Sequence, residues 1–350
     1  MEEFIMKKLV KSVLSVAMVG MMLAGCGSTA TPTSGAAETK EPSAAETAQA
    51  SEGEFDGTVK IAFSTWTGYA PFFVARDAGI FEKNGVDVEL VIMENGGDKK
   101  AAMASGQLQA VAETVDTNAM AIAADLDHVQ VLALDTSDGG DGVVAKSEIK
   151  TFADLKGKNV ALDTTGGASI FYFNYLLKEN GMTMDDIIVQ NMSSGDAGAA
   201  FVGGKVDAAV TWEPWLTNAK NTEFGNVLAD SSTAPGVIVD SLSFSSDFIA
   251  KYPATVQKIV NSWNEAVDYY NANHDESVEM MAKGFGMDAA EIESTLPTVK
   301  FYGKEDNQDY FKNGKIQEIS QMAMDLWFDM GLIDKKVDIA QCIDASFVTE

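Results

Sequence analysis

Two short stretches of the sequence combine aromatic rings with polar side chains that could hold a small molecule. Trp66 and Tyr69 lie in a Gly- and Pro-containing run over residues 64–71, and Trp212 and Glu213 open the run Trp-Glu-Pro-Trp. Aromatic rings stack on flat groups, and a carboxylate beside an indole attracts a cation. We therefore predict noncovalent capture of a solute that presents a flat or amine-bearing part. In the alternative interpretation, the rings pack in the core and Glu213 caps a helix or forms a local ion pair.

Further polar candidates lie where strands are expected to end and helices to begin. Thr165 and Ser169 flank a Gly-Gly-Ala run, whose free backbone N–H groups could bind an anionic or polar head. Simple N-capping of the following helix explains the same residues. Thr117 lies at the start of another expected helix, and Asp138 belongs to an acidic segment, residues 135–141, that would favour a cationic group. A solvated acidic loop is the alternative for this segment.

The composition offers few of the residues that catalysis or metal binding commonly uses. The chain has two histidines, His128 and His274, two cysteines and a single arginine, Arg76. A histidine-based triad or a His/Cys metal site is not expected, so we predict a protein that is not an enzyme and needs no cofactor and no metal. The 52 acidic and 25 basic residues give a net charge of −27, which repels nucleic acid. Surface solubility alone is the alternative explanation of this acidity.

A cysteine near the N-terminus has the sequence context of a lipid attachment site. Residues 9–23 are mostly apolar, too few for a stable membrane span, and follow a lysine-rich start. Leu-Ala-Gly-Cys at 23–26 resembles the bacterial lipoprotein cleavage box. We predict a lipoprotein signal peptide over residues 1–25 and diacylglycerol attachment at Cys26. An ordinary signal peptide with an incidental cysteine is the alternative.

The segment that follows this cysteine predicts a tether. Residues 26–57 are mainly Ser, Thr, Ala, Gly, Glu and Pro, and such a composition cannot bury enough apolar surface to offset its chain entropy. The prediction is a disordered linker that holds a folded body at the extracytoplasmic face of the cell membrane. Cys342 then has no partner for an intrachain disulfide and is expected to be a quiet, partly buried thiol.

From residue 58 onward, apolar runs alternate with helical periodicities. The expected strands cover residues 59–63, 86–92, 108–112, 129–134, 159–162, 185–191 and 206–211. The expected helices cover residues 72–81, 99–105, 117–124, 170–179, 197–202, 247–252, 253–271, 276–284, 288–296 and 315–330. This alternation is typical of an α/β fold with a mainly parallel sheet in the first unit. A chain that completes a second unit and returns to the first has two hinge crossovers, and ligands bind between such units.

Four segments carry a resemblance to a known family. They read GYAPFFVARDAGIFEKNGVDVELV, GDKKAAMASGQLQAV, FADLKGKNVAL and GKVDAAVTWEPWL. In this order, behind a lipoprotein box, they resemble the substrate-binding proteins of bacterial ABC importers of the nitrate/sulfonate/taurine and thiamine-precursor superfamily. The resemblance implies a bilobal type II periplasmic-binding-protein fold with two mixed sheets. One lobe would comprise residues 58–141 and 240–350, and the other residues 142–239.

The same resemblance implies a function and a set of partners. A monomer would capture a small solute between its lobes and deliver it to an ABC permease with its ATPase. A sulfonate or taurine-like solute is the first expectation, because its sulfonate could lie at Thr165 and Ser169 and its ammonium at Glu213 or Asp138. An aminopyrimidine-like or other cationic aromatic solute is the alternative. An enzyme on this scaffold is less favoured, because the related pyrimidine synthases use a His/Cys-rich site, and a purely structural lipoprotein would not need these loop residues.

Overall fold

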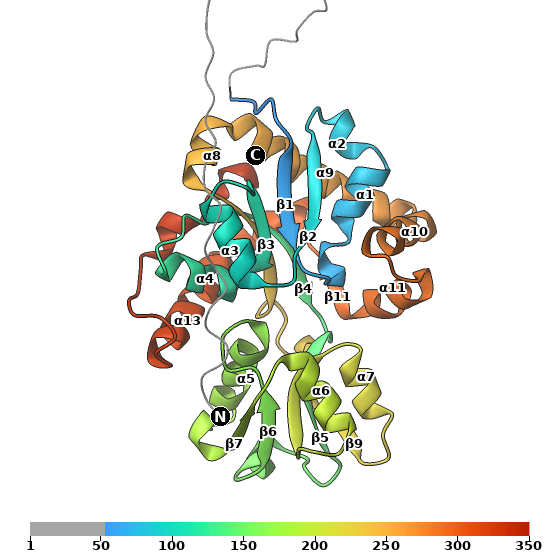
Figure 1. Cartoon of the computed structure of the whole chain (residues 1–350), viewed down its shortest axis with the longest axis vertical. Helices are drawn as coiled ribbons and strands as arrows, with labels where there is room; N and C mark the ends of the chain where they lie inside the picture. The colour runs from blue at the N-terminus through green and yellow to red at the C-terminus, as the bar shows by residue number, and fades with distance from the viewer. Residues whose placement is uncertain (1–52, 350) are drawn as a thin grey trace, which may run out of the picture. The chain divides into compact units, whose positions relative to one another are not determined.

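The computed structural model describes residues 53–349, which form helices packed on two β-sheets (Figure 1). The first sheet has six strands in the order β11-β4-β10-β3-β1-β2, and the second has five in the order β7-β6-β8-β5-β9. Parallel and antiparallel pairs occur in both sheets. The predicted α/β class with two mixed sheets is therefore confirmed.

The first sheet contains both parallel and antiparallel strand pairs. Its strands are β1 (Val59–Phe63), β2 (Val88–Ile92), β3 (Ala110–Thr114), β4 (Val129–Ser137), β10 (Val239–Phe244) and β11 (Val299–Phe301). Strand β1 pairs in parallel with β2 and β3, whereas β10 runs antiparallel between β3 and β4. The mainly parallel first sheet expected from the sequence is wrong, because the strand that returns from the second unit inserts between β3 and β4.

The second sheet contains the strands that lie between the two crossovers. They are β5 (Asp141–Lys146), β6 (Asn159–Leu162), β7 (Ile188–Asn191), β8 (Ala208–Trp212) and β9 (Gly225–Asp230). Strand β6 pairs in parallel with β7 and β8, and β5 pairs antiparallel with β8 and β9. Strands β4 and β5 follow one another closely, and β9 is followed by β10, so the chain passes between the sheets twice within the described residues.

The helices cover the sheets and largely follow the predicted periodicities. They are α1 (Pro71–Asp77), α2 (Ile80–Lys83), α3 (Gly96–Ala104), α4 (Val115–Ala123), α5 (Ala168–Glu179), α6 (Ser194–Val202), α7 (Trp215–Lys220), α8 (Ser246–Lys251), α9 (Pro253–Ala272), α10 (His274–Phe285), α11 (Ala289–Thr295), α12 (Lys304–Lys312) and α13 (Lys315–Asp329). Gly79, with φ +71°, divides the helix predicted over 72–81 into α1 and α2, because glycine adopts this left-handed conformation readily.

Two buried tryptophans fix the helices that lie against the first sheet. Trp263 of α9 packs edge-on to Phe72 of α1 with ring centroids 4.7 Å apart, and its indole N–H donates to the carbonyl of Tyr302 at 2.9 Å. Trp327 of α13 donates its indole N–H to the carbonyl of Asp116 at 2.9 Å. This second bond holds the first turn of α4, which borders the candidate site described below.

The N-terminal predictions lie mostly outside the described residues. The signal peptide over 1–25, the lipidation of Cys26 and the tether up to residue 52 are not covered by the structure. Residues 53–57, which the sequence interpretation placed in the tether, contact the body: Phe55 packs on Phe248 at 5.3 Å between ring centroids, and its N–H donates to Thr255 Oγ1 at 2.8 Å. In residues 53–349, none of the helices combines the length and apolarity that a membrane crossing requires.

Candidate functional site

The polar residues of interest gather where several strands of the first sheet end. Strands β1, β3 and β4 run in the same direction, and β10 runs opposite to β3 and β4. The loop after β1, the start of α4, the end of β4 and the beginning of β10 therefore meet at one edge of the sheet. This carboxyl-terminal edge is where open α/β sheets bind ligands.

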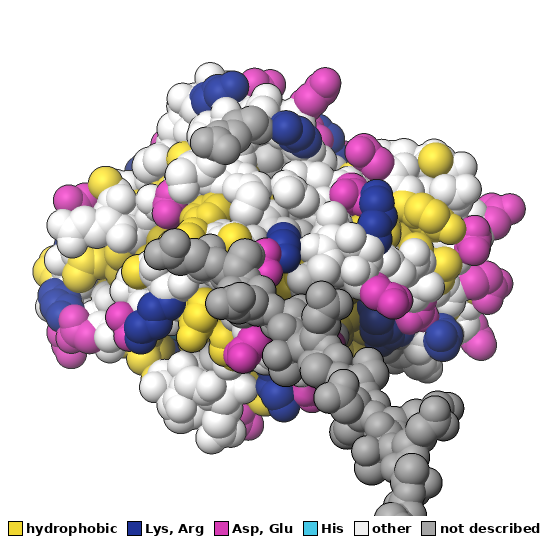
Figure 2. Space-filling model, turned by 90° about the horizontal axis from the view of Figure 1, so that it is seen from above, with side chains coloured by type: hydrophobic (Ala, Val, Ile, Leu, Met, Phe, Trp, Pro, Cys, Tyr) yellow, Lys and Arg dark blue, Asp and Glu magenta, His cyan; other side chains and the backbone are white. Residues whose placement is uncertain are grey.

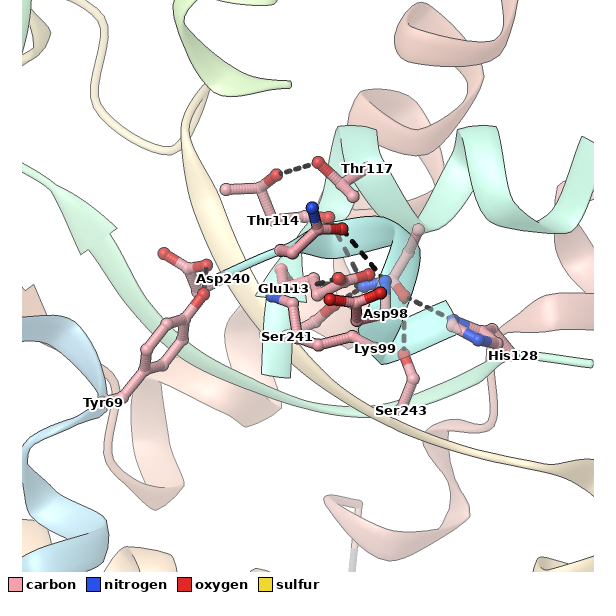
Figure 3. Close-up of polar contacts among 12 residues, drawn as sticks. Tyr69, Asp98, Lys99, Glu113, Thr114, Thr117, His128, Asp240, Ser241 and Ser243 are labelled. Atoms are coloured by element: carbon pink, nitrogen blue, oxygen red, sulfur yellow. Dashed lines mark hydrogen bonds and ion pairs between the residues drawn. The ribbon is translucent and has the colours of Figure 1, made fainter. Parts of the chain in front are cut away.

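Hydrogen bonds to buried carboxyl groups hold both aromatic residues of the first loop. The half-buried Trp66 donates its indole N–H to Asp135 Oδ1 at 3.1 Å. Tyr69 is only 3% exposed and donates its hydroxyl to Asp240 Oδ1 (Figure 3). Its ring also packs on Phe63 of β1, with the centroids 5.5 Å apart. Of the two rings, the indole of Trp66 is the one left accessible to a solute.

Gly68 lets this loop lie directly on the carboxyl group of Asp135. A Cβ atom at position 68 would collide with Cγ and Oδ2 of Asp135 and with the indole nitrogen of Trp66. Overpacking of this kind forces neighbouring side chains off their preferred positions. The glycine therefore contributes to the site by its lack of a side chain.

Asp135 and Asp240 are direct cross-strand neighbours. They are register partners on β4 and β10, and Asp240 is also the partner of Thr114 on β3. Both carboxyl groups are buried, and burial followed by their mutual proximity raises the pKa of Asp135 well above its usual value. Burial is also the main cause that raises the pKa of Asp240. Two adjacent buried carboxyls cannot both ionise cheaply, so this arrangement favours a proton on the pair.

The end of β3 and the start of α4 add a second acidic group beside this pair. Glu113 is buried and lies 3.1 Å from the ammonium of Lys99 of α3. Asn118 donates to the carbonyl of Glu113 and, at 3.0 Å, to Ser241 Oγ, which ties α4 to β10. Burial raises the pKa of Asp116 to about 7.

The crossover from β4 to β5 is built around Ser231. Its hydroxyl lies 2.8 Å from Ser137 Oγ and accepts the N–H of Gly139 at 2.7 Å. Asp141 follows at the start of β5, and burial raises the pKa of its carboxyl to about 6. A Cβ at Gly140 would stand 2.8 Å from the indole of Trp66, so that ring lies against the crossover.

Trp212 and Glu213 lie on the other side of the same crossover. Trp212, 40% exposed, is the register partner of Asp141, and the N–H of Glu213 donates to the carbonyl of Gly140 at 2.9 Å. The structure thus brings Trp66 and Glu213 to the same backbone segment. The carboxylate of Glu213 accepts bonds from Thr217 N at 3.0 Å and Thr217 Oγ1 at 2.9 Å. This is the local capping contact considered above, and it leaves part of the carboxylate surface free for a further donor.

The remaining predicted residues have local partners. Thr165 is exposed and donates its N–H and hydroxyl to Asp163 Oδ1 at 2.8 and 2.7 Å. Ser169 is buried and accepts the hydroxyl of Ser194 at 2.9 Å. Thr117 Oγ1 lies 2.8 Å from Thr114 Oγ1 (Figure 3). Helix α4 begins at Val115 with Thr114 at its N-cap position, so the predicted start of this helix at Thr117 is wrong by two residues.

Asp138 and the loop before α5 each contact a neighbouring segment. Asp138 is exposed, and its N–H donates to the carbonyl of Thr298 at 2.8 Å. A Cβ at Gly166 would lie 2.5 Å from the methyl of Met120, so the Gly-Gly run before α5 approaches α4 closely. Phe171 of α5 also packs on Trp327 of α13, with the centroids 5.9 Å apart.

Of two surface hollows in the described residues, one is lined by a predicted site residue. A hollow of about 120 Å³ lies beside Glu213 and is lined by Gly139, Glu213, Leu216, Thr217, Lys220, Val227 and Asp230. A larger hollow of about 720 Å³ lies between α9 and α12 and contains none of the predicted residues. We take the residues around the crossover as the candidate site, because the buried titratable groups gather there.

We call Trp66, Tyr69, Asp135, Gly140 and Asp240 the crossover site. Asp240 was not among the predicted site residues, although it is a single acid within an apolar run, whereas Asp135 and Asp141 were predicted only as members of the acidic segment 135–141. Within residues 53–349, the His, Cys, Asp and Glu side chains form no group of three or more that could hold a metal ion.

Comparison with known proteins places this architecture in a family. The sequence matches the NMT1-like family over residues 52–283, which is more than half of the chain. The chain belongs to the NMT1-like family. A relative in Brucella abortus (strain 2308), named only as a candidate binding protein, is 25% identical to this NMT1-like protein over 268 residues, or 76% of this chain and 83% of the relative.

Two further comparisons concern proteins whose names state a solute. A protein of Escherichia coli (strain K12), named as a candidate aliphatic sulfonates-binding protein, is 30% identical over 212 residues, covering 57% of this chain and 61% of that protein. The crystal structure of the periplasmic aliphatic sulphonate binding protein SsuA from Escherichia coli matches with a TM-score of 0.70 at 24% identity, covering 82% of this chain and 92% of SsuA. This structural likeness confirms the expected periplasmic-binding-protein fold.

Proposed function

We propose that this NMT1-like protein is the extracytoplasmic solute-binding protein of an ABC importer. It captures one small organic solute at the crossover site and passes it to a membrane permease that an ATPase drives. The observation that carries this proposal is the meeting of the Trp66 loop, Gly140 and Glu213 at one crossover, in a family whose compared members are named as binding proteins. We further propose that residues 58–141 with 240–350, and residues 142–239, are lobes that close on the solute about the two crossovers, and that the protein acts as a monomer.

The first solute class that we propose is an aliphatic sulfonate, with taurine-like aminosulfonates preferred. The names of the E. coli relative and of SsuA support the sulfonate. The Gly-Gly-Ala run between Thr165 and Ser169, at the start of α5, offers backbone N–H groups to an anionic head. The alternative is an aminopyrimidine-like or other cationic aromatic solute, which the buried acids and the rings of Trp66 and Trp212 favour.

We propose a binding role rather than catalysis. His128 is buried, with Nδ1 3.2 Å from Asn118 Oδ1, and burial lowers its pKa. His274 lies at the start of α10 and contacts Glu293 at 2.9 Å. Neither histidine belongs to the crossover site, which supports reversible capture over acid–base chemistry there.

A screen of small solutes by thermal unfolding tests the proposed function. The panel holds taurine, ethanesulfonate, nitrate and thiamine, with sodium chloride at matched ionic strength as the control. A solute that binds only the folded protein stabilises it by about 2.7 kcal/mol at a hundred times its dissociation constant. We expect a rise of several degrees in the unfolding midpoint for one solute class, and no turnover of that solute. A uniform response to every salt would contradict specific binding.

Membrane anchoring is proposed through Cys26, which lies outside the described residues. We expect Cys26→Ser to move the protein from the membrane fraction to the soluble extracytoplasmic fraction, because the thioether to diacylglycerol can no longer form. Fractionation and labelling with a fatty-acid analogue in the native host check this. Cys342→Ser is the matched control and should stay membrane-bound. A Cys26→Ser protein that still carries the label would contradict the anchor.

A further inference from the structure

The crossover site lies on an unusual concentration of buried acid. Five carboxyl groups, each from a different helix or strand, are at most 6% exposed: Glu113, Asp116, Asp135, Asp141 and Asp240. The cation that the structure places against them is Lys99, whose ammonium is paired with Glu113 at 3.1 Å. One ammonium cannot balance these groups, and uncompensated charge in a protein interior is costly.

The Asp135–Asp240 pair lies directly beneath the aromatic loop. One oxygen of Asp135 accepts the indole N–H of Trp66, and one oxygen of Asp240 accepts the hydroxyl of Tyr69. Oδ2 of Asp135 is buried, accepts no hydrogen bond from an N–H or hydroxyl donor of the described residues, and faces the loop at Gly68, while a proton shared with Asp240 would join the two carboxyls. A buried carboxyl oxygen without a donor is the kind of group that a ligand or a proton completes.

We propose that the solute carries a cationic group, and that Asp135 and Asp240, which lie beneath the accessible indole of Trp66, form the negative floor that selects it. This inference rests on the proposed function and names the chemical class of its solute. Hydrogen bonding to a buried carboxyl fixes the plane of the indole and adds electron density to the ring, which strengthens its attraction for an ammonium or a heteroaromatic cation. The two acids are positioning residues for the rings rather than direct ligands.

The charge balance of this negative floor couples solute binding to the release of a proton. Burial and mutual proximity raise the pKa values of the pair, so in the empty protein the pair retains a proton at neutral pH. A cation bound against the indole of Trp66 neutralises part of the negative charge of the pair, and the proton is released to the solvent. The titratable or charged groups that face the pair are Tyr69 from the loop, Glu113 and Asp116 from β3 and α4, Lys99 from α3, Asp141 from β5 and Tyr302 after β11.

Calorimetric titration of the full chain with two matched probes tests this inference. Taurine carries an ammonium and a sulfonate, whereas ethanesulfonate of similar size lacks the ammonium. We expect taurine to bind at least about tenfold more tightly, because a charge-assisted interaction is worth roughly 1.4 kcal/mol or more. Titration in two buffers of different ionisation enthalpy should show proton release with taurine and none with ethanesulfonate. Thiamine serves as the cationic aromatic probe and should also release a proton.

Asp240→Asn removes one charge while it keeps the shape of the side chain. We expect the preference for taurine and the proton release to disappear in this variant, whereas Asp247→Asn on α8, where the side chain is 82% exposed, should keep both. Asp135→Asn gives the same test if Asp240→Asn does not fold. A merely structural role of the pair would change affinities but leave the proton count and the taurine-to-ethanesulfonate ratio unaltered.

The outcomes separate this inference from the proposed function. Equal binding of taurine and ethanesulfonate, without proton release, would overturn the cationic floor and leave a sulfonate-binding protein. Binding of thiamine with proton release, without binding of either sulfonate, would support the floor and shift the solute class. Absence of binding by all three probes would overturn the inference together with the solute classes proposed above.

Discussion

Replacing Trp66 with Ala is expected to weaken solute binding about tenfold to a hundredfold, equivalent to roughly 1–3 kcal/mol. The indole is half-buried, its N–H is held by Asp135 at 3.1 Å, and its ring edge lies against Gly140. A ring fixed before the solute arrives loses little entropy on binding, so its full stacking surface is available. Titration calorimetry of the purified variant gives the change directly.

Two control variants sharpen this measurement. Trp66→Phe keeps an aromatic face but loses the N–H donor to Asp135, so an intermediate loss of affinity is expected. Phe328→Ala removes an exposed ring of α13 far along the chain from the site and should leave binding unchanged. Wild-type affinity in a folded Trp66→Ala protein would exclude the indole from the solute contact.

The solute-free protein is expected to lose stability as the pH rises from about 4 to about 7. Burial raises the pKa of Asp116 to about 7 and that of Asp141 to about 6, from an ordinary value of 3.8. In this window the folded protein binds more protons than the unfolded chain, so deprotonation favours unfolding, and the loss levels off above pH 7. The lowered pKa of His128 acts in the opposite direction below its ordinary value of 6.5, but as a single group.

Thermal unfolding followed by circular dichroism at pH 5 and pH 8 checks this sign. The unfolding midpoint should be several degrees higher at pH 5, and Asp116→Asn should reduce the difference because one buried carboxyl no longer ionises. Asp247→Asn, on the exposed face of α8, should leave the difference unchanged. A higher midpoint at pH 8 would show that these carboxyls are stabilised as anions in the folded protein.

Local sequence patterns predicted the elements whose apolar residues are continuous. Strands β1 and β6 match the predicted bounds, because each is a short apolar run between polar or glycine-containing segments. Strand β9 was not predicted, and all its residues are half-exposed, so it lacks a buried run. Helix α12 was also missed, because it buries only Asn307, Tyr310 and Phe311 and is otherwise charged.

Only part of the candidate site could be predicted from the sequence. The aromatic loops were found because rings, Gly and Pro after an expected strand are a local signal. The Asp135–Asp240 pair was not found as a pair, because the two residues are about a hundred positions apart and meet only when β10 inserts between β3 and β4. No periodicity within either strand specifies that antiparallel insertion, so the most acidic part of the site comes from topology.

Calorimetric titration of the wild-type protein with the solute that gives the largest thermal shift tests the central claim most directly. The account predicts saturable binding of one solute molecule per chain, which competes with other members of its chemical class and weakens in Trp66→Ala. A titration that shows no saturable heat for any sulfonate, amine or cationic heteroaromatic in the panel would contradict a solute-binding role for the crossover site.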